Sequence, residues 1–92
     1  MFLSDSDAQF EAIQSQFDAS TGVTTDTRAA GAGQLFFALK GENFNGNAYA
    51  QQAIEAGCIA AVVDESEYVP PGDPRFILVP DALAALQSLA RW

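Results

Sequence analysis

Apolar residues recur at helical spacing in three parts of the chain. In the first part, Phe10, Ile13 and Phe17 follow the i, i+3, i+7 pattern of an amphipathic helix, and Ser4 and Ser6 are candidates for its N-cap. We therefore predict one helix near the start of the chain, with these three apolar side chains on the face that packs against the core.

The second and third helical patterns have clearer ends. A helix is predicted over residues 47–56, and Gly57 follows at the position where many helices end in left-handed backbone. Another helix is predicted after Asp81, which is a favourable N-cap residue. The residues predicted to face the core from these two helices are Tyr49, Ala50, Ala53, Ile54, Leu83, Leu86 and Ala90.

Four short segments have the composition of strands. Residues 22–27, GVTTDT, are rich in β-branched residues and predict an edge strand or an extended loop. Residues 34–40 contain LFFAL, which is apolar at every position, as in a strand that helices cover on both faces. Residues 59–63 and 75–79 predict two further strands, and the glycines of the GAG segment at 31–33 predict a turn.

The predicted order of elements is α-β-β-α-β-β-α. The strand–helix–strand unit over residues 34–63 has the length of a right-handed crossover between parallel strands. The expected fold class is α/β: a small three-layer α/β/α sandwich with a mostly parallel or mixed sheet. We assign residues 1–92 to one domain, with a helical lead-in over 1–21 and a core over 22–92. The last helical pattern runs to Trp92 without a C-cap glycine, which suggests the N-terminal domain of a longer protein.

Composition and charge narrow the class of protein. A content of 49% hydrophobic residues is typical of a folded domain rather than a disordered segment. Twelve acidic residues against four basic ones, a net charge of -8, argue against nucleic acid and anionic membranes as partners. The longest apolar run, residues 58–63, is much shorter than the roughly 20 residues that span a bilayer. We expect a cytoplasmic protein without membrane insertion.

Several kinds of catalytic or cofactor site are excluded by the residues present. Histidine is absent and Cys58 is the single cysteine, so a Ser-His-Asp triad, a Cys-His pair and a disulfide within the chain are excluded, and no Cys/His metal site is indicated. No glycine-rich phosphate loop occurs. We predict no catalytic residue, metal or cofactor for this chain, and we interpret the acidic residues Asp64, Glu65 and Glu67 as solvated surface.

Two polar loops flank the central predicted strand, over residues 24–28 (TTDTR) and 40–47 (KGENFNGN). Ligands of open α/β sheets bind beyond the carboxyl ends of the strands, where loop N–H groups can meet an anion. Arg28 can bind a phosphate through two hydrogen bonds, Lys40 supplies a positive charge, and the Thr and Asn side chains can recognise a base or a sugar.

The same loops also have a purely structural interpretation. Asp26 can pair with Arg28, the Asn45-Gly46 dipeptide can be an ordinary turn, Asn47 can cap a helix and Lys40 can be solvated. Composition and spacing leave both interpretations open.

Four motifs in order resemble the N-terminal domain of the Mur ligase family. They are TDTR, LFFALKGENFNGN, AIEAGCIAAVV and VPDALAALQSLA, and together they run from about Val23 to Arg91. The likeness is greatest to the members that add D-alanyl-D-alanine to UDP-N-acetylmuramoyl-tripeptide in peptidoglycan synthesis. Two motifs depart from the family pattern, since Asp26-Thr27-Arg28 stands where Asp-Ser-Arg is frequent and Asn45-Gly46-Asn47 stands where Asp-Gly-His is frequent.

The resemblance implies a division of labour within a longer enzyme. This domain would hold the UDP end of the UDP-N-acetylmuramoyl-peptide substrate. A central domain of the same chain would bind ATP and magnesium, and a C-terminal domain would bind D-alanyl-D-alanine. The full enzyme would form an acyl phosphate that the D-alanyl-D-alanine amine attacks, so this piece alone would be inactive.

Position by position, the resemblance also implies which residues contact UDP. Thr25 and Thr27 match residues that contact the uridine, and Glu42, Asn43 and Phe44 match the loop that lies against the uracil. Arg28 would bind phosphate or hold its loop through Asp26. The complete predicted UDP-binding set is Thr25, Thr27, Arg28, Lys40, Glu42, Asn43, Phe44, Asn45, Gly46 and Asn47.

Two alternative functions stay open. The chain could belong to the Mur ligases that add the third residue of the peptide, because the residues that select the incoming amino acid or dipeptide lie elsewhere in such enzymes. It could also be a non-enzymatic regulatory or interaction module with a similar small α/β fold.

Overall fold

Four parallel strands form the central sheet of the computed structural model, which describes residues 5–28 and 31–91. The strand order is β1-β2-β5-β6. The registers Val23↔Leu35, Phe36↔Ala61 and Val62↔Ile77 connect the sheet from edge to edge. The strands are β1 Val23–Thr24, β2 Leu35–Phe37, β5 Ala60–Val63 and β6 Phe76–Leu78. The predicted α/β class and the mostly parallel sheet are confirmed, and β1, predicted as an edge strand or an extended loop, is one of the two edge strands.

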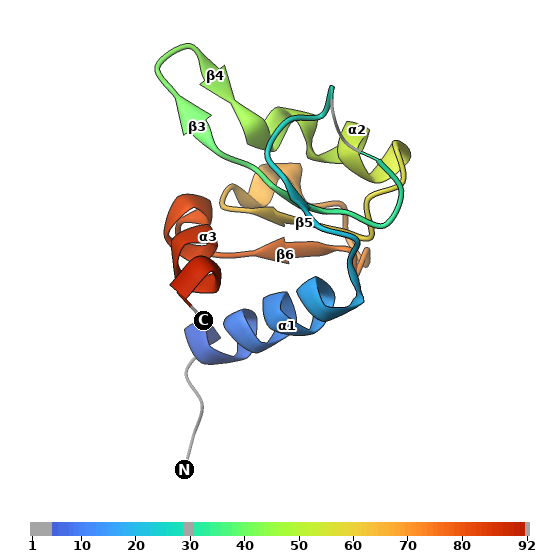
Figure 1. Cartoon of the computed structure of the whole chain (residues 1–92). Coiled ribbons are helices and arrows are strands. Elements are labelled where there is room, and N and C mark those ends of the chain that lie inside the picture. Colours follow the sequence, from blue (N-terminus) through green and yellow to red (C-terminus); the bar gives the residue numbers. More distant parts are fainter. Residues whose placement is uncertain (1–4, 29–30, 92) are drawn as a thin grey trace.

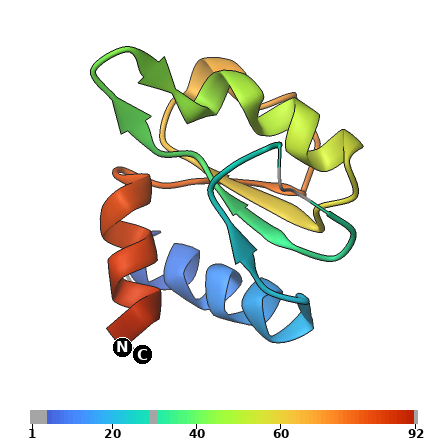
Figure 2. The ribbon, with the colours of Figure 1, turned by 45° about the horizontal axis from the view of Figure 1, so that its top comes forward.

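Helices cover both faces of this sheet (Figures 1 and 2). Helices α1 (Asp5–Ala19) and α3 (Ala82–Arg91) pack on one face. Helix α2 (Ala50–Glu55) packs on the other face and is preceded by the 3-10 helix η1 (Gly46–Tyr49). A second 3-10 turn, η2 (Ser66–Tyr68), follows β5. Gly57, which has φ +111°, follows α2 in the left-handed region as predicted.

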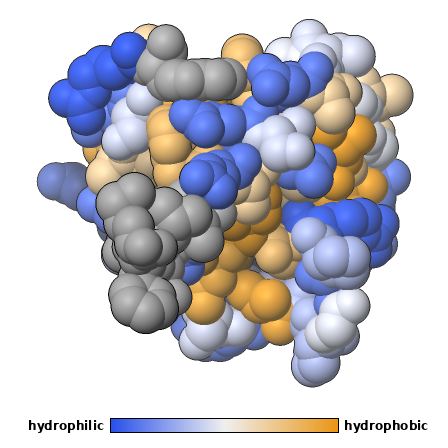
Figure 3. All heavy atoms as spheres, turned by 90° about the horizontal axis from the view of Figure 1, so that it is seen from below, coloured by the Kyte–Doolittle hydropathy of each residue, from blue (hydrophilic) through white to orange (hydrophobic). Residues whose placement is uncertain are grey.

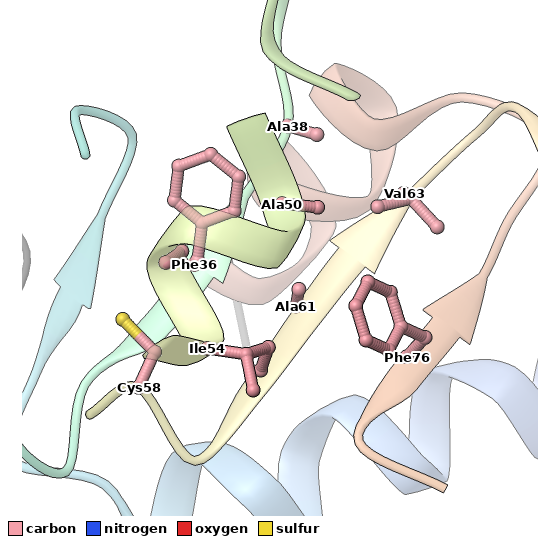
Figure 4. Packing of buried hydrophobic residues seen from close by; sticks show 9 residues of the cluster. Phe36, Ala38, Ala50, Ile54, Cys58, Ala61, Val63 and Phe76 are labelled. Atoms are coloured by element: carbon pink, nitrogen blue, oxygen red, sulfur yellow. The ribbon is translucent and has the colours of Figure 1, made fainter. Parts of the chain in front are cut away.

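The core consists of two layers, because side chains of the buried strands point alternately to opposite faces. Leu35 and Phe37 pack toward α1 and α3, whereas Phe36 and Ala38 pack toward α2. Figure 4 shows the layer that faces α2, with Phe36, Ile54 and Ala61 among its labelled side chains. All residues of β2 and β5 are buried, which explains why LFFAL is apolar without alternation.

The strand predicted over residues 34–40 is shorter than expected. Strand β2 ends at Phe37, and β3 (Lys40–Gly41) instead pairs antiparallel with β4 (Phe44–Asn45). A hydrogen bond joins the two ends of this segment: the Gly46 N–H donates to the Leu39 carbonyl at 2.7 Å. Residues 40–45 are therefore a hairpin that projects from the sheet (Figure 1).

The helices exist as predicted, but several side chains face differently. Ile13 is buried, whereas Phe17, in the last turn of α1, and Tyr49, in η1 before α2, are exposed. Leu83 and Ala90 are also exposed. The packed face of α3 is one residue out of phase with the prediction, because it consists of Ala82, Ala85, Leu86 and Leu89. Both phases are apolar at helical spacing, so periodicity alone could not choose between them.

The sequence offered two candidate N-cap residues for α1, Ser4 and Ser6. Ser4 lies outside the described residues. Ser6 lies inside the helix, which begins at Asp5, so it is not the N-cap. At the start of α3 the prediction is confirmed, because the Asp81 carboxylate accepts a hydrogen bond from the Ala84 N–H at 3.1 Å.

Candidate functional site

The two polar loops leave the same edge of the sheet. Thr24 of β1 pairs in parallel with Phe36 of β2, so the loops that follow both strands start from the carboxyl edge. Asp64, which follows β5, lies at this edge as well. Figure 2 shows the hairpin and the start of α3 at this end of the molecule.

Gly46 fixes how the β3–β4 hairpin leaves β2. A Cβ atom at this position would lie 2.6 Å from the Leu39 carbonyl oxygen and 2.8 Å from the Leu39 nitrogen. Real contacts between carbon and oxygen are longer, at about 3.3 Å or more. The close approach of the two backbone segments therefore requires glycine.

The far end of the hairpin is open to solvent. Glu42 and Asn43 are exposed at its turn, and Phe44 is 49% exposed. The Phe44 ring stacks on Tyr49 of η1, with ring centroids 5.4 Å apart and an angle of 11° between the planes. The pair forms a supported aromatic surface, which is the kind of surface on which a nucleobase can stack.

The base of the hairpin is held by two asparagines. The Asn45 side-chain oxygen accepts from the Asn47 N–H at 3.0 Å and from the Asn47 side-chain amide at 2.9 Å, so Asn45 rather than Asn47 is the N-cap of η1. Asn47 is only 1% exposed. Its amide also donates to Asp64 Oδ1 at 2.9 Å, and its oxygen accepts from the Asp64 N–H at 2.9 Å. Asn47 thus joins η1 to the end of β5.

Lys40 is paired with two carboxylates at the same place. Its Nζ lies 3.3 Å from Asp64 Oδ1 and 3.5 Å from Glu65 Oε2, while 46% of the side chain stays accessible. The hydrogen bond with Asp64, followed by the charges of Asp64 and Glu65, raises the pKa of Lys40 above its ordinary value. Lys40 is therefore a charged group that is both positioned and reachable from solvent.

Asp64 and Glu65 are the site residues that the sequence interpretation missed. The Asp64 side chain is 6% exposed, and its Oδ2 accepts the Ala82 N–H at 2.9 Å. Burial alone would raise the pKa of Asp64, but hydrogen bonds from Ala82, Asn47 and Lys40 outweigh burial and lower it. Glu65, 27% exposed, accepts the Asn45 amide at 2.6 Å. The prediction that Asp64 is solvated surface is wrong; its position directly after a buried parallel strand was the available signal.

The TDTR loop is organised around Asp26. The Asp26 carboxylate accepts the Arg28 backbone N–H at 2.8 Å and pairs with the Arg28 guanidinium at 2.9 Å, and Arg28 lowers the pKa of Asp26. Asp26 N–H in turn donates to the Thr24 hydroxyl at 3.2 Å. Of the two roles predicted for Arg28, the pairing with Asp26 is present. The guanidinium remains 90% exposed.

The predicted residues fall into two groups rather than one cluster. Lys40 and Asn47 meet at Asp64, Asn45 is bonded to Asn47 and Glu65, and Phe44 lies further along the same hairpin. Thr27 and Arg28 instead border a shallow depression of about 310 Å³ together with Gln52 and Glu55 of α2, and Thr25 is exposed near the end of β1.

Another cavity lies on the opposite face of the sheet. It has a volume of about 220 Å³ and lies between α1 and α3, where Phe10, Ile13 and Ala85 supply apolar walls. Figure 3 shows apolar surface gathered on this side of the molecule, seen from below. Within residues 5–28 and 31–91, no group of three or more Cys, Asp or Glu side chains is arranged to hold a metal ion, and no helix is long and apolar enough to cross a membrane.

Comparisons with a family model and with known protein sequences point to the same family. The family model "Mur ligase family, catalytic domain" matches residues 20–91. The UDP-N-acetylmuramoyl-tripeptide--D-alanyl-D-alanine ligase of Bacillus subtilis (strain 168) is 50% identical over 70 residues, which are 76% of this chain and 15% of that enzyme. The UDP-N-acetylmuramoyl-L-alanyl-D-glutamate--2,6-diaminopimelate ligase of Parasynechococcus marenigrum (strain WH8102) is 43% identical over 61 residues, 64% of this chain and 12% of that enzyme.

Solved structures agree with these sequence matches. A crystal structure of MurF from Acinetobacter baumannii superimposes with a TM-score of 0.64 and 26% identity over 86% of this chain and 19% of that protein. The MurF ligase from Thermotoga maritima in complex with ADP has a TM-score of 0.68 and 23% identity over 79% of this chain and 16% of that protein, a likeness of fold. The chain therefore spans less than a fifth of the length of each of these relatives.

Proposed function

This chain belongs to the Mur ligase family, and we propose that it is the N-terminal domain that holds the UDP moiety of a UDP-N-acetylmuramoyl peptide. The observation that supports this most is the exposed Phe44–Tyr49 stack on the hairpin at the carboxyl edge of the sheet, together with the partly accessible Lys40 of the same hairpin. An aromatic face suits a uracil ring, and a lysine ammonium on the same hairpin can contribute to binding a diphosphate.

The proposed UDP contacts divide into groups that touch the ligand and groups that hold the loop. Thr25, Thr27, Glu42, Asn43 and Phe44 have accessible surface and would recognise the uridine, and Lys40 and Arg28 would face the phosphates. The remaining three residues of the predicted set are buried or bonded to protein groups and would keep the hairpin in place: Asn45, Gly46 and Asn47.

For the whole protein we propose an ATP-dependent ligase that adds D-alanyl-D-alanine to UDP-N-acetylmuramoyl-tripeptide in the cytoplasm. The identity of 50% to the Bacillus subtilis enzyme supports this activity. ATP, magnesium and D-alanyl-D-alanine would bind to central and C-terminal domains outside this chain. A gene whose reading frame continues past Trp92 into a glycine-rich phosphate loop would support a ligase rather than a non-enzymatic module, and a frame without one would contradict it.

A ligase that adds the third peptide residue is the second candidate. It is favoured by the 43% identity to the diaminopimelate ligase of Parasynechococcus marenigrum, although that match covers 64% of the chain instead of 76%. Assaying the complete protein with UDP-N-acetylmuramoyl-dipeptide and with the tripeptide separates the two activities. We expect turnover only with the tripeptide and D-alanyl-D-alanine.

A titration of the ¹⁵N-labelled chain with UDP, followed by NMR, tests the proposed site. We expect amide shifts over residues 25–28 and 40–47. Shifts confined to the cavity between α1 and α3, or no shifts at millimolar UDP, would contradict the assignment. Phe44→Ala should weaken the binding of UDP and of uridine alike, whereas Lys40→Met should weaken UDP more than uridine, because only UDP carries the phosphates.

A further inference from the structure

The β3–β4 hairpin needs an anchor, because its two strands form a sheet of their own, separate from the four-stranded sheet. A two-stranded hairpin by itself is at best marginally stable in water. Its base is tied to the chain by the hydrogen bond from the Gly46 N–H to the Leu39 carbonyl. Its position relative to β5 and α3 depends on the contacts that Lys40, Asn45 and Asn47 make with Asp64 and Glu65.

Asp64 connects four elements through one side chain and one backbone group. From the end of β5, its Oδ1 lies 3.3 Å from Lys40 Nζ of β3 and accepts the Asn47 amide of η1 at 2.9 Å. Its Oδ2 accepts the N–H of Ala82, the first residue of α3, at 2.9 Å. The Asp64 N–H completes a reciprocal pair of hydrogen bonds with Asn47.

These contacts keep the buried carboxylate charged. The N-terminus of α3 favours a negative charge on one side, and the Lys40 ammonium favours it on the other. With only 6% of its side chain exposed, Asp64 has little surface left for a ligand. Of the three charged groups that meet here, Lys40 is the most accessible, with 46% of its side chain exposed against 6% for Asp64 and 27% for Glu65.

We propose that Asp64 is a positioning residue for the UDP loop: it fixes Lys40 and Asn47, and with them the hairpin, at the carboxyl edge of the sheet without touching the ligand. This inference deepens the proposed function and depends on it for the identity of the ligand. The anchoring itself is a property of the free protein and can be measured separately.

The test compares Asp64→Asn with Asp73→Asn. Asp73 is a matched control because it also accepts a backbone N–H and pairs with one basic side chain, Arg75, but it lies outside the hairpin network. Two quantities are measured by NMR: amide hydrogen exchange over residues 40–47 in the free protein, and the Kd for UDP. In Asp64→Asn, we expect hairpin exchange to rise and the Kd to increase about tenfold, the factor that matches the loss of one hydrogen bond to a charged group. In Asp64→Asn, exchange over residues 40–47 should rise by a larger factor than exchange in β2 and β5, which follows global stability, and all values for Asp73→Asn should stay unchanged.

The outcomes separate the inference from the proposed function. If the wild-type chain shows no UDP shifts, the proposed ligand is wrong, and hairpin exchange alone decides whether Asp64 is the anchor. If UDP binds to both variants equally and hairpin exchange is the same, Asp64 does not position the loop. Should Asp64→Asn fail to fold, Lys40→Met leaves the buried carboxylate in place, and faster hairpin exchange in that variant supports the anchor while unchanged exchange overturns it.

In the double variant Asp64→Asn/Lys40→Met, the two effects on the Kd for UDP should add only in part, because Asp64 acts through Lys40 as well as through Asn47. Fully additive effects would mean that none of the effect of Asp64 passes through Lys40, and would contradict the proposal.

Discussion

Replacing Gly46 by alanine should destabilise the protein through the hairpin that carries the proposed UDP contacts. The new Cβ would lie 2.6 Å from the Leu39 carbonyl oxygen and 3.0 Å from the Ala38 carbonyl carbon. Because ordinary carbon–oxygen contacts begin near 3.3 Å, the hairpin or the end of β2 must move by about 0.7 Å. The strain of overpacking, about 1–3 kcal/mol, and the loss of the hydrogen bond between Gly46 and Leu39, about 1 kcal/mol, together give about 2–4 kcal/mol.

Urea unfolding followed by circular dichroism measures this loss. With a slope of about 1–2 kcal/mol per molar urea for a small domain, the midpoint should fall by about 1–4 M. The matched control is Gly41→Ala, in the same hairpin, where nothing lies within 4 Å of the added Cβ and the expected change is below about 0.5 kcal/mol. Equal midpoints for Gly46→Ala and Gly41→Ala would refute the close approach of the two backbone segments.

Three further predictions concern ionisation, helix phase and the buried thiol. Because Asp64 has a lowered pKa, its ionised form stabilises the fold above the ordinary carboxyl pKa of about 4, and this contribution is lost as pH falls through the lower folded value. The urea midpoints of wild type and Asp64→Asn should therefore converge as pH falls below about 4, and a constant difference would argue against it. Leu89→Ala should lower the free energy of unfolding in urea by about 2–4 kcal/mol and Leu83→Ala by less than about 1 kcal/mol, because Leu89 is 7% and Leu83 49% exposed. The reverse order would mean that α3 packs with its other face. Burial raises the pKa of the Cys58 thiol, so its reaction with a disulfide reagent at pH 8 should be at least about tenfold slower in the folded than in the urea-unfolded chain, and equal rates would show an accessible thiol.

The sequence allowed the candidate site to be predicted where a motif, or a glycine that the backbone requires, marks the residues. The hydroxyl, amide and glycine density of residues 40–47 pointed to the carboxyl edge of the sheet, from which this segment does project, and the need for Gly46 is explained by a backbone contact. The separation of the predicted residues into two groups, one at Asp64 and one beside α2, could not be predicted from the sequence. Asn47 reads as an ordinary polar loop residue, yet it is buried and bonded to Asp64, 17 positions further along the chain.

The sequence by itself determined the class of fold and the order of its elements, because the apolar periods are local properties of each segment. An uninterrupted LFFAL run predicts a strand covered on both faces, and β2 has that environment. Which apolar phase of α3 packs inward, whether Lys40 continues the strand, and what Asp64 does were decided only by the tertiary structure. Each of these depends on partners brought together from distant positions, such as Lys40, Asn47 and Ala82 around one carboxylate, and no local pattern encodes that meeting.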